Sequence, residues 1–364
     1  MSTSLEVVLG AKNLIGVIEA IKPGSGAADL LPPAFLVPTK TIEGDSGDYD
    51  KINNTREIAR LVQYGSPSRA RNLQGVSKVG VKLLHSFEHI NLDASVLINL
   101  KDPTDFRQNL GQKEVVRQLA AFKNYFTNLR AGAVFSALAT GKISFDVNGN
   151  LLPDDSGAYT PIDFGIPAGN LTQLDVLGTG DIISAKWSTA ATDISAQVEN
   201  LKTAAMALTG YPIRHAFHGK SILGFLATNN GLKGSLSHNQ DFSKSVGQGA
   251  IPDGLLGLSW HPMSEAYSQL ASAGKFWWPD DAVVFTPEPS PDWWELLEGT
   301  TPIPSNLNIV GAESAWGQIQ LAKGIFSYAQ IMNDPCLIRL FSGDTFLPLL
   351  KVPRSVFIAD VDFE

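Results

Sequence analysis

The clearest candidate for chemistry in this sequence is a cluster of two histidines and a glutamate. His85, Glu88 and His89 match the inverted zinc-protease pattern H-x-x-E-H. In that pattern a helix brings both histidines to one face to bind zinc, and the glutamate acts as general base. Residues 79–84 read VGVKLL, which is typical of a strand, and residues 91–93 read as a turn. We therefore predict two partly exposed structural histidines here and not a zinc site.

Two glycine-containing segments resemble parts of nucleotide-binding loops. Gly219-Lys220-Ser221 is similar to the end of a phosphate-binding P-loop, but Arg214 replaces the glycine that the pattern requires five positions earlier. Gly178-Thr179-Gly180 lacks the third glycine of a dinucleotide fingerprint, because position 183 is isoleucine. We predict an ordinary turn from a strand to a helix at the first segment and no nucleotide site at the second.

Two further patterns also favour structural roles. Residues 146–150 (DVNGN) superficially resemble a calcium loop, but the glycine is fourth instead of sixth and no glutamate is twelfth. Asn148-Gly149 instead predicts a hairpin turn. His215 and His218 fall on a predicted strand, whose alternation directs them to opposite faces.

The single cysteine and the two tryptophan pairs also favour structural roles. Cys336 cannot form a disulfide within the chain, and we expect a buried packing thiol, with a bridge between subunits as the alternative. Trp277-Trp278 and Trp293-Trp294 favour packing in a core or an interface over ligand stacking. We therefore predict no catalytic residue, no cofactor, no metal and no enzymatic activity.

Composition excludes several classes of partner. The chain has 364 residues, a net charge of −8 and only 18% charged residues. Lys and Arg do not form the basic cluster of a sequence-specific DNA reader, so any contact with DNA would be non-specific. No apolar run approaches the length of a membrane span, and the N-terminus does not read as a signal peptide. A low charge density is compatible with a chain that buries much of its surface against copies of itself.

A long helix is the strongest structural signal. Over residues 112–140, apolar side chains recur at spacings of three and four, and Gly141 follows where a helix commonly ends. At 1.5 Å per residue, this helix would be roughly 43 Å long. A strand over 142–147 and the hairpin turn follow. A second helix is predicted over 193–208, capped by Thr192 or Asp193 and ended by Gly210.

The other elements suggest an α+β fold without regular βαβ alternation. We predict a helix over 4–22, an apolar arm over Pro23–Pro38, and strands over 39–43 and 78–84 that flank a long projecting polar loop. A helix is expected over 221–228. Further strands are predicted over 212–217, 255–260, 282–287, 324–332, 337–341, 346–350 and 356–361.

The order of these elements resembles the tailed-bacteriophage major capsid protein family of the phage lambda major head protein type. The resemblance extends over nearly the whole chain and rests on these segments in order: Leu31–Leu36, Thr39–Asp45, Ala139–Ile143, Ile162–Gly165, Trp187, Ala216–Gly219 with Asn229-Asn230, Trp278–Val284, and Asp344–Leu350 with Pro353. It implies the tailed-phage capsid fold, which has an N-terminal arm, an extended loop, a peripheral domain with a spine helix, and an axial domain. On this basis we divide the chain into 1–38 (helix and arm), 39–92 (extended β-loop), 93–192 (peripheral domain), 193–335 (axial domain) and 336–364 (C-terminal strands that close the peripheral and axial domains).

The resemblance implies a major capsid protein that self-assembles into hexamers and pentamers of an icosahedral shell around the phage genome. Scaffold, portal and decoration proteins would be its partners, and it would be assembled in the bacterial cytoplasm and located in the virion. An encapsulin-like compartment shell, a zinc hydrolase using 85–89 and a tail-tube protein are the alternatives. Two interpretations of the loop stay open: a solvated charged loop, or pairing of its arginines with Asp45, Asp48 and Asp50 of a neighbour. The arginines in question are Arg56, Arg60, Arg69 and Arg71.

Overall fold

A computed structural model describes most of the chain. The described residues are 9–22, 31–44, 46–52, 76–92, 94–101, 105–145, 151–152, 159–236, 250–252, 254–263, 278–304, 308–309, 319–333 and 336–363. The predicted hairpin turn at Asn148-Gly149, Trp277 and the four loop arginines lie outside these ranges.

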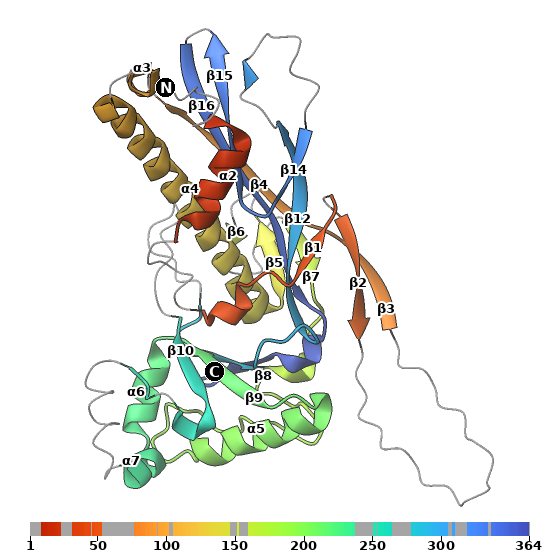
Figure 1. The fold of residues 1–364 in the computed structure, drawn as a ribbon. Coiled ribbons are helices and arrows are strands. Elements are labelled where there is room, and N and C mark those ends of the chain that lie inside the picture. The colour runs from red at the N-terminus through yellow and green to blue at the C-terminus, as the bar shows by residue number, and fades with distance from the viewer. Residues whose placement is uncertain are drawn as a thin grey trace, which may run out of the picture.

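A seven-stranded sheet forms the upper part of the molecule (Figure 1). Its central strand, β16 (Cys336–Leu350), pairs antiparallel with β4 (Leu84–Leu92), with β15 (Phe326–Asn333) and with β12 (Trp294–Pro304). β12 also pairs with β14 (Ile319–Lys323) and, in parallel, with β1 (Lys40–Ile42), while β13 (Asn308–Ile309) pairs with β15. Strands from both ends of the chain therefore meet in one sheet.

The long helix α4 (Asp105–Thr140) lies along this sheet (Figure 1). The predicted helix over 112–140 is confirmed, and it begins seven residues earlier than expected. Gly111 lies inside the helix where α3 (Ala94–Lys101) packs, and a Cβ there would be 2.9 Å from Leu100 Cγ. Gly141 ends the helix with a φ of 70°, a left-handed conformation that suits glycine, and its amide donates to Ala137 O at 3.1 Å.

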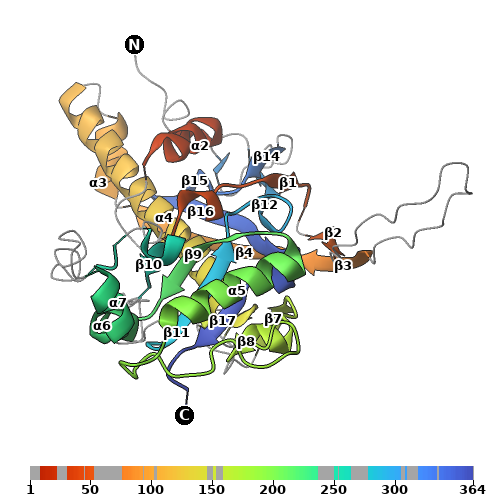
Figure 2. The same cartoon turned by 90° about the horizontal axis from the view of Figure 1, so that it is seen from below.

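A second, five-stranded sheet forms the lower part of the molecule, in the order β10-β9-β11-β17-β8 (Figures 1 and 2). The strands are β8 (Leu171–Thr172), β9 (Ile213–His218), β10 (Ser259–Pro262), β11 (Ala282–Pro287) and β17 (Phe357–Asp360). Helices α5 (Ile194–Thr209), α6 (Ser221–Thr228) and α7 (Asn230–Leu236) accompany this sheet. The Asp193 side chain accepts a hydrogen bond from Ala196 N, and Gly210 ends α5 in a left-handed conformation, so both predicted ends of this helix are confirmed.

Two smaller β units extend from this body. β2 (Ser46–Ile52) and β3 (Val76–Lys82) pair antiparallel and stand away from the rest of the molecule (Figures 1 and 2). β5 (Lys142–Phe145) pairs with β6 (Leu151–Leu152) and with β7 (Tyr159–Asp163). The strands on either side of the predicted Asn148-Gly149 turn therefore form the expected hairpin.

The N-terminal segment packs onto both parts of the molecule. The helix predicted over 4–22 is described as α2 (Ala11–Ala20), and its Leu14 and Ile18 are buried with α4 and the large sheet. Further on, Phe35 is fully buried in the short helical turn η2 (Pro33–Phe35) and makes edge contacts with Phe217 and Trp294. Trp278, Trp293 and Trp294 are all buried, so core packing is confirmed for these three residues.

Several predicted strands differ from the structure. Residues 255–257 form the short turn η4 and not a strand. Gly254, Leu256 and Gly257 have positive φ, which is incompatible with extended backbone, so the strand predicted from 255 begins at Ser259. The strands predicted over 337–341 and 346–350 are one continuous strand, since residues 342–345 keep their pairing with β4. The long strand β12 was not predicted.

The range 193–335 contributes strands to both sheets, and the range 336–364 also reaches both, as expected of strands that close the two domains. β12, β14 and β15 belong to the upper sheet, whereas β17 near the C-terminus belongs to the lower one. Similarly, β4 falls within the range 39–92 that is assigned to the extended loop, but it pairs with β16 over its whole length. Pairing between distant segments, which has no local signature, decides these memberships.

Candidate assembly surfaces and the ionic cluster behind them

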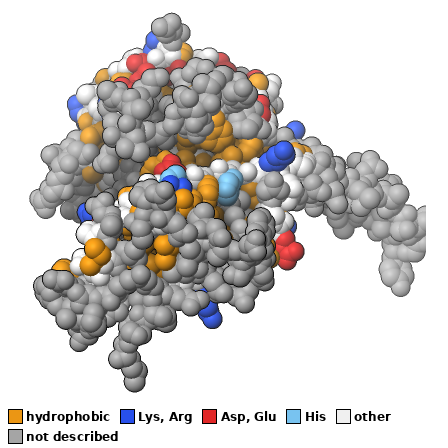
Figure 3. Space-filling view, turned by 90° about the horizontal axis from the view of Figure 1, so that it is seen from above, with side chains coloured by type: hydrophobic (Ala, Val, Ile, Leu, Met, Phe, Trp, Pro, Cys, Tyr) orange, Lys and Arg blue, Asp and Glu red, His pale blue; other side chains and the backbone are white. Residues whose placement is uncertain are grey.

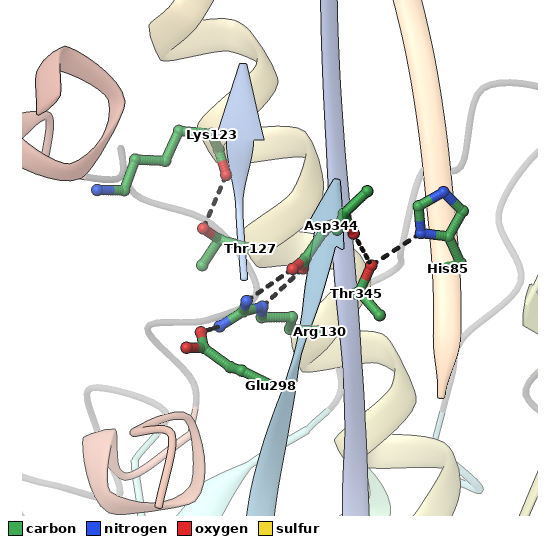
Figure 4. Close-up of polar contacts among 8 residues, drawn as sticks. His85, Lys123, Thr127, Arg130, Glu298, Asp344 and Thr345 are labelled. Carbon is green, nitrogen blue, oxygen red and sulfur yellow. Dashed lines mark hydrogen bonds and ion pairs between the residues drawn. The ribbon is translucent and has the colours of Figure 1, made fainter. Parts of the chain in front are cut away.

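A buried ionic cluster joins α4 to the large sheet (Figure 4). Arg130 of α4 donates two hydrogen bonds to Asp344 of β16, from Nε to Oδ2 and from NH2 to Oδ1, both at 2.7 Å. Its third nitrogen, NH1, lies 2.9 Å from Oε1 of Glu298 on β12. One guanidinium thus joins a helix and two strands that are distant in sequence.

The electrostatics of this cluster favour the charged form of the arginine. Burial alone lowers the pKa of Arg130, but the charges and hydrogen bonds of Asp344 and Glu298 outweigh it, and the net pKa is raised. The guanidinium also lies 5.5 Å from the centre of the Phe346 ring. A side chain at Gly324 would collide with the cluster, since a Cβ there would be 2.5 Å from Glu298 Oε1. The cluster is therefore closely packed against Phe346 and the backbone of Gly324.

A second polar contact fixes the N-terminal helix on α4. Lys123 of α4 donates from Nζ to the carbonyl oxygens of Ile18 and Glu19, at 2.7 and 2.9 Å. These carbonyls lie in the last turn of α2, where a cation complements the partial negative charge of the helix end. Burial lowers the pKa of Lys123. The contact orients α2 relative to the long helix.

The predicted histidines lie on one face of β4, on either side of an exposed phenylalanine. His85 Nδ1 lies 2.8 Å from Thr345 Oγ1 (Figure 4), and His89 packs against the ring of Phe341. Phe87 is 46% exposed and stacks on Phe341 with ring centres 5.5 Å apart. Glu88 is on the other face, where it accepts a hydrogen bond from Tyr125 OH.

This geometry does not form a metal site. Positions four apart in a strand are roughly 13 Å apart, which is too far for two histidines to share one ion. Among the described residues, no group of three or more His, Cys, Asp or Glu side chains is arranged to hold a metal. The strand-like context inferred from the sequence is confirmed.

The other motif candidates occupy structural positions. Gly219 turns from β9 into α6, and a Cβ there would be 2.2 Å from the carbonyl oxygens of Pro279 and Asp280, so its role is close packing. His215 Nδ1 lies 3.0 Å from His261 Nε2, and His215 Nε2 lies 2.8 Å from Glu288 Oε2. The His218 ring packs against Trp260. The alternation predicted for this histidine pair agrees with their separate surroundings.

Exposed apolar side chains mark possible contact surfaces. On β14, Ile319 and Leu321 are 68% and 64% exposed. Seen from above, hydrophobic side chains gather in a hollow near the middle of the molecule with histidines beside them (Figure 3). Contiguous exposed apolar patches, unlike single exposed residues, are typical of surfaces that bind other proteins. The further exposed members of this class are Val37, Phe87, Ile98, Leu110, Val116, Tyr125, Leu177 and Met206.

Comparison with known proteins gives the family. The model of the phage major capsid protein E family matches residues 10–294. The chain belongs to this family. A comparison with curated protein sequences gives no match. The predicted resemblance to the lambda-type head proteins is confirmed, and the protein is a shell-forming capsid protein of a bacteriophage.

Solved structures agree with this assignment at the level of the fold. A phage-related protein from Bordetella bronchiseptica RB50 is 11% identical, with a TM-score of 0.51 over 97% of this chain and 97% of its own. The capsid protein assigned to a prophage of E. coli CFT073 is 15% identical, with a TM-score of 0.52 over 97% of this chain and 99% of its own. The capsid protein therefore has the α+β fold that was predicted.

The polar residues that matter most in this capsid protein were not predicted from sequence. Arg130 was part of the predicted long helix, and Asp344 lay between two predicted strands, but neither carried an expected role. A charged residue inside an otherwise apolar helix stripe is the signal that would have identified Arg130.

In the part of the chain that the structure describes, no helix is long and apolar enough to cross a membrane.

Proposed function

We propose that this capsid protein forms hexamers and pentamers that close into an icosahedral shell around the phage genome. The observation that supports this most is its family membership over residues 10–294, combined with a projecting β2–β3 hairpin beside a long helix. A projecting element places side chains beyond the subunit's own core, where a neighbouring subunit is the natural partner. Scaffold, portal and decoration proteins are proposed as further partners, with assembly in the bacterial cytoplasm.

The upper sheet with α4 is the proposed peripheral domain, and the lower sheet with α5 to α7 the proposed axial domain. Residues 1–38 would be the arm and 39–92 would contain the extended loop. The ionic cluster of Arg130 holds the spine helix on its sheet, which suits a rigid unit that is repeated many times. No enzymatic step is proposed, since a shell requires contacts and not catalysis.

Arg56, Arg60, Arg69 and Arg71 are proposed to contact a neighbouring subunit from the loop between β2 and β3. The supporting observation is the position of these strands, which leave the body as a two-stranded ribbon (Figure 2). Their acidic partners on the neighbour are the second part of this proposal, with Asp45, Asp48 and Asp50 as candidates.

Electron microscopy and light scattering of the purified protein test this function. We expect closed particles or capsomers from the wild type. Ile52 and Val76 are paired residues at the end of the ribbon, so residues 53–75 can be replaced by an Asn-Gly turn that closes the hairpin. We expect this variant to fold and to lose stable shells. A wild type that stays monomeric at high concentration with scaffold present would contradict the proposal.

A further inference from the structure

A short acidic loop with an exposed leucine leaves one edge of the lower sheet. Residues 175–181 follow β8, and the loop is closed by hydrogen bonds from Ile182 N to Leu174 O at 3.2 Å and from Ile183 N to Gln173 O at 2.9 Å. Leu174 and Ile183 are fully buried and anchor it. Leu177 is 50% exposed. The loop thus holds an apolar side chain in water.

Acidic groups lie on both sides of this leucine. Asp175 precedes it and accepts a hydrogen bond from Gly180 N at 3.0 Å, which shapes the loop. Asp181 follows it and is exposed, and it is not paired with a cation of the described residues. The loop therefore presents one apolar group between two carboxylates.

A groove with the opposite character lies between α5 and the start of β9. Its volume is about 560 Å³. Met206 is 39% exposed in the groove, and Arg214 is exposed and has no ion pair with the described carboxylates. Lys202 contributes a second cation, which pairs with Glu199 at 2.8 Å and donates to the Leu256 carbonyl. The remaining lining residues are Thr203, Ala207, Pro212, Ile213 and Gly257.

The loop and the groove belong to opposite edges of the same sheet. In the order β10-β9-β11-β17-β8, the loop follows β8 at one edge, while Gly257 and Arg214 belong to the β10–β9 edge. A single subunit therefore presents the two surfaces on different sides. Contacts between unlike surfaces of identical subunits are head-to-tail, and they form closed rings when the rotation between neighbours closes.

Strained backbone conformations occur both at loop 175–181 and at the α5–β9 groove. Among the described residues, the non-glycine residues with positive φ are Thr172, Leu174 and Leu256. The first two lie at the base of the loop, and Leu256 lies next to the groove residue Gly257. Strained backbone of this kind persists where the surrounding structure enforces it, and it is common at binding sites. Both surfaces are thus held in a defined shape before any contact.

We propose that loop 175–181 of one subunit docks into the α5–β9 groove of its neighbour. Leu177 would pack against Met206, and Asp181 would pair with Arg214. Charge complementarity and the opposite placement of the two surfaces favour a second copy of this chain as the occupant. The inference rests on the proposed shell function and identifies the contact that joins subunits around a ring.

A charge-exchange experiment tests this contact. One variant carries Asp181→Arg and the other carries Arg214→Asp, so each alone brings like charges together at every contact. We expect each to associate at least about tenfold more weakly than the wild type by light scattering. Mixed in equal amounts, the two variants can alternate around a ring, where every contact then joins opposite charges, so rings with an even number of subunits should return. Lys233→Glu, at an exposed lysine of α7, is the control and should assemble as the wild type does.

Each result has a defined meaning. Recovery in the mixture also shows that both variants are folded. If the wild type assembles and the single variants assemble equally well, the docking contact is wrong while the shell function stands. If the single variants fail and their mixture also fails, the groove binds something other than this loop, such as an acidic peptide of another protein, and the inference is overturned. If the wild type itself stays monomeric, the proposed function fails together with the inference.

Discussion

Arg130 and Asp344 form an ion pair with two hydrogen bonds in the interior, although 214 residues separate them in the sequence. The aspartate side chain is completely buried, and that of Glu298, which completes the cluster, is mostly buried. Bidentate arginine–carboxylate pairs fix the orientation of both groups. The pair therefore determines where the long helix lies on the central strand.

Removing the arginine should destabilise the subunit strongly. In Arg130→Met, Asp344 is left buried without its partner, and breaking a buried pair in this way costs about 3–5 kcal/mol. The free energy of unfolding of the unassembled subunit, measured with urea, should fall by this amount. Arg130→Met combined with Asp344→Asn should recover part of the loss, because the buried charge is removed.

Arg117 offers a matched control on the same helix. It pairs with Glu114 at 2.6 Å on the exposed surface, where water screens the interaction. Arg117→Met should leave the unfolding free energy unchanged within error. Equal losses for the two arginine variants would mean that the burial of the cluster contributes nothing.

Two glycines close together in sequence should respond oppositely to the same substitution. Gly219→Ala places a Cβ 2.2 Å from two backbone oxygens, which cannot move aside, so we expect a loss of about 1–3 kcal/mol or more. Gly224 lies in the exposed middle of α6 with nothing within 4 Å of a new Cβ. Gly224→Ala should stabilise the subunit by about 0.5–1 kcal/mol. Thermal melting of both variants checks the pair, and a stable Gly219→Ala would contradict the close packing.

His218 should make the stability depend on pH. Burial lowers the pKa of His218 in the folded state, and the hydrogen bond with the Gly219 carbonyl only partly opposes this. As pH falls below about 6.5, His218 therefore binds a proton in the unfolded chain before it does so in the folded protein. The stability contributed by the neutral histidine is lost over this pH range, until His218 is also protonated in the folded state. The slope is at most about 1.4 kcal/mol per pH unit. The difference in unfolding free energy between wild type and His218→Gln should therefore shrink on acidification, and a constant difference would refute the assignment.

Local signals were enough to predict several elements from sequence. Asp193 and Gly210 mark the two ends of α5 because a cap and a left-handed glycine act within one turn. The apolar stripe of α4 follows from helical periodicity, and the strand β11 from a short run of apolar and β-branched residues. These features depend on neighbours in sequence, so the sequence alone contains them.

Other features depend on distant partners. Gly343 and Asp344 have low strand propensity, yet β16 continues through them because β4 pairs alongside and Arg130 neutralises the aspartate. β12 contains three residues that disfavour strands, Gly299, Pro302 and Pro304, and it is held by β14 and β16. The predicted contacts of Arg56, Arg60, Arg69 and Arg71 lie outside the described residues and stay predictions.

The histidines of β4 provide the last prediction. Because β4 is a strand, Phe87 lies between His85 and His89 on one face, and Glu88 is on the opposite face with Tyr125. The three groups of the H-x-x-E-H pattern therefore do not converge on one point. We expect that elemental analysis of the purified protein finds no stoichiometric zinc, and that His85→Ala combined with His89→Ala still assembles. The double variant should lose the hydrogen bond with Thr345, and we expect a loss of about 0.5–1.5 kcal/mol in unfolding free energy from this bond. One zinc per chain that disappears in the double variant would show that the segment adopts another structure.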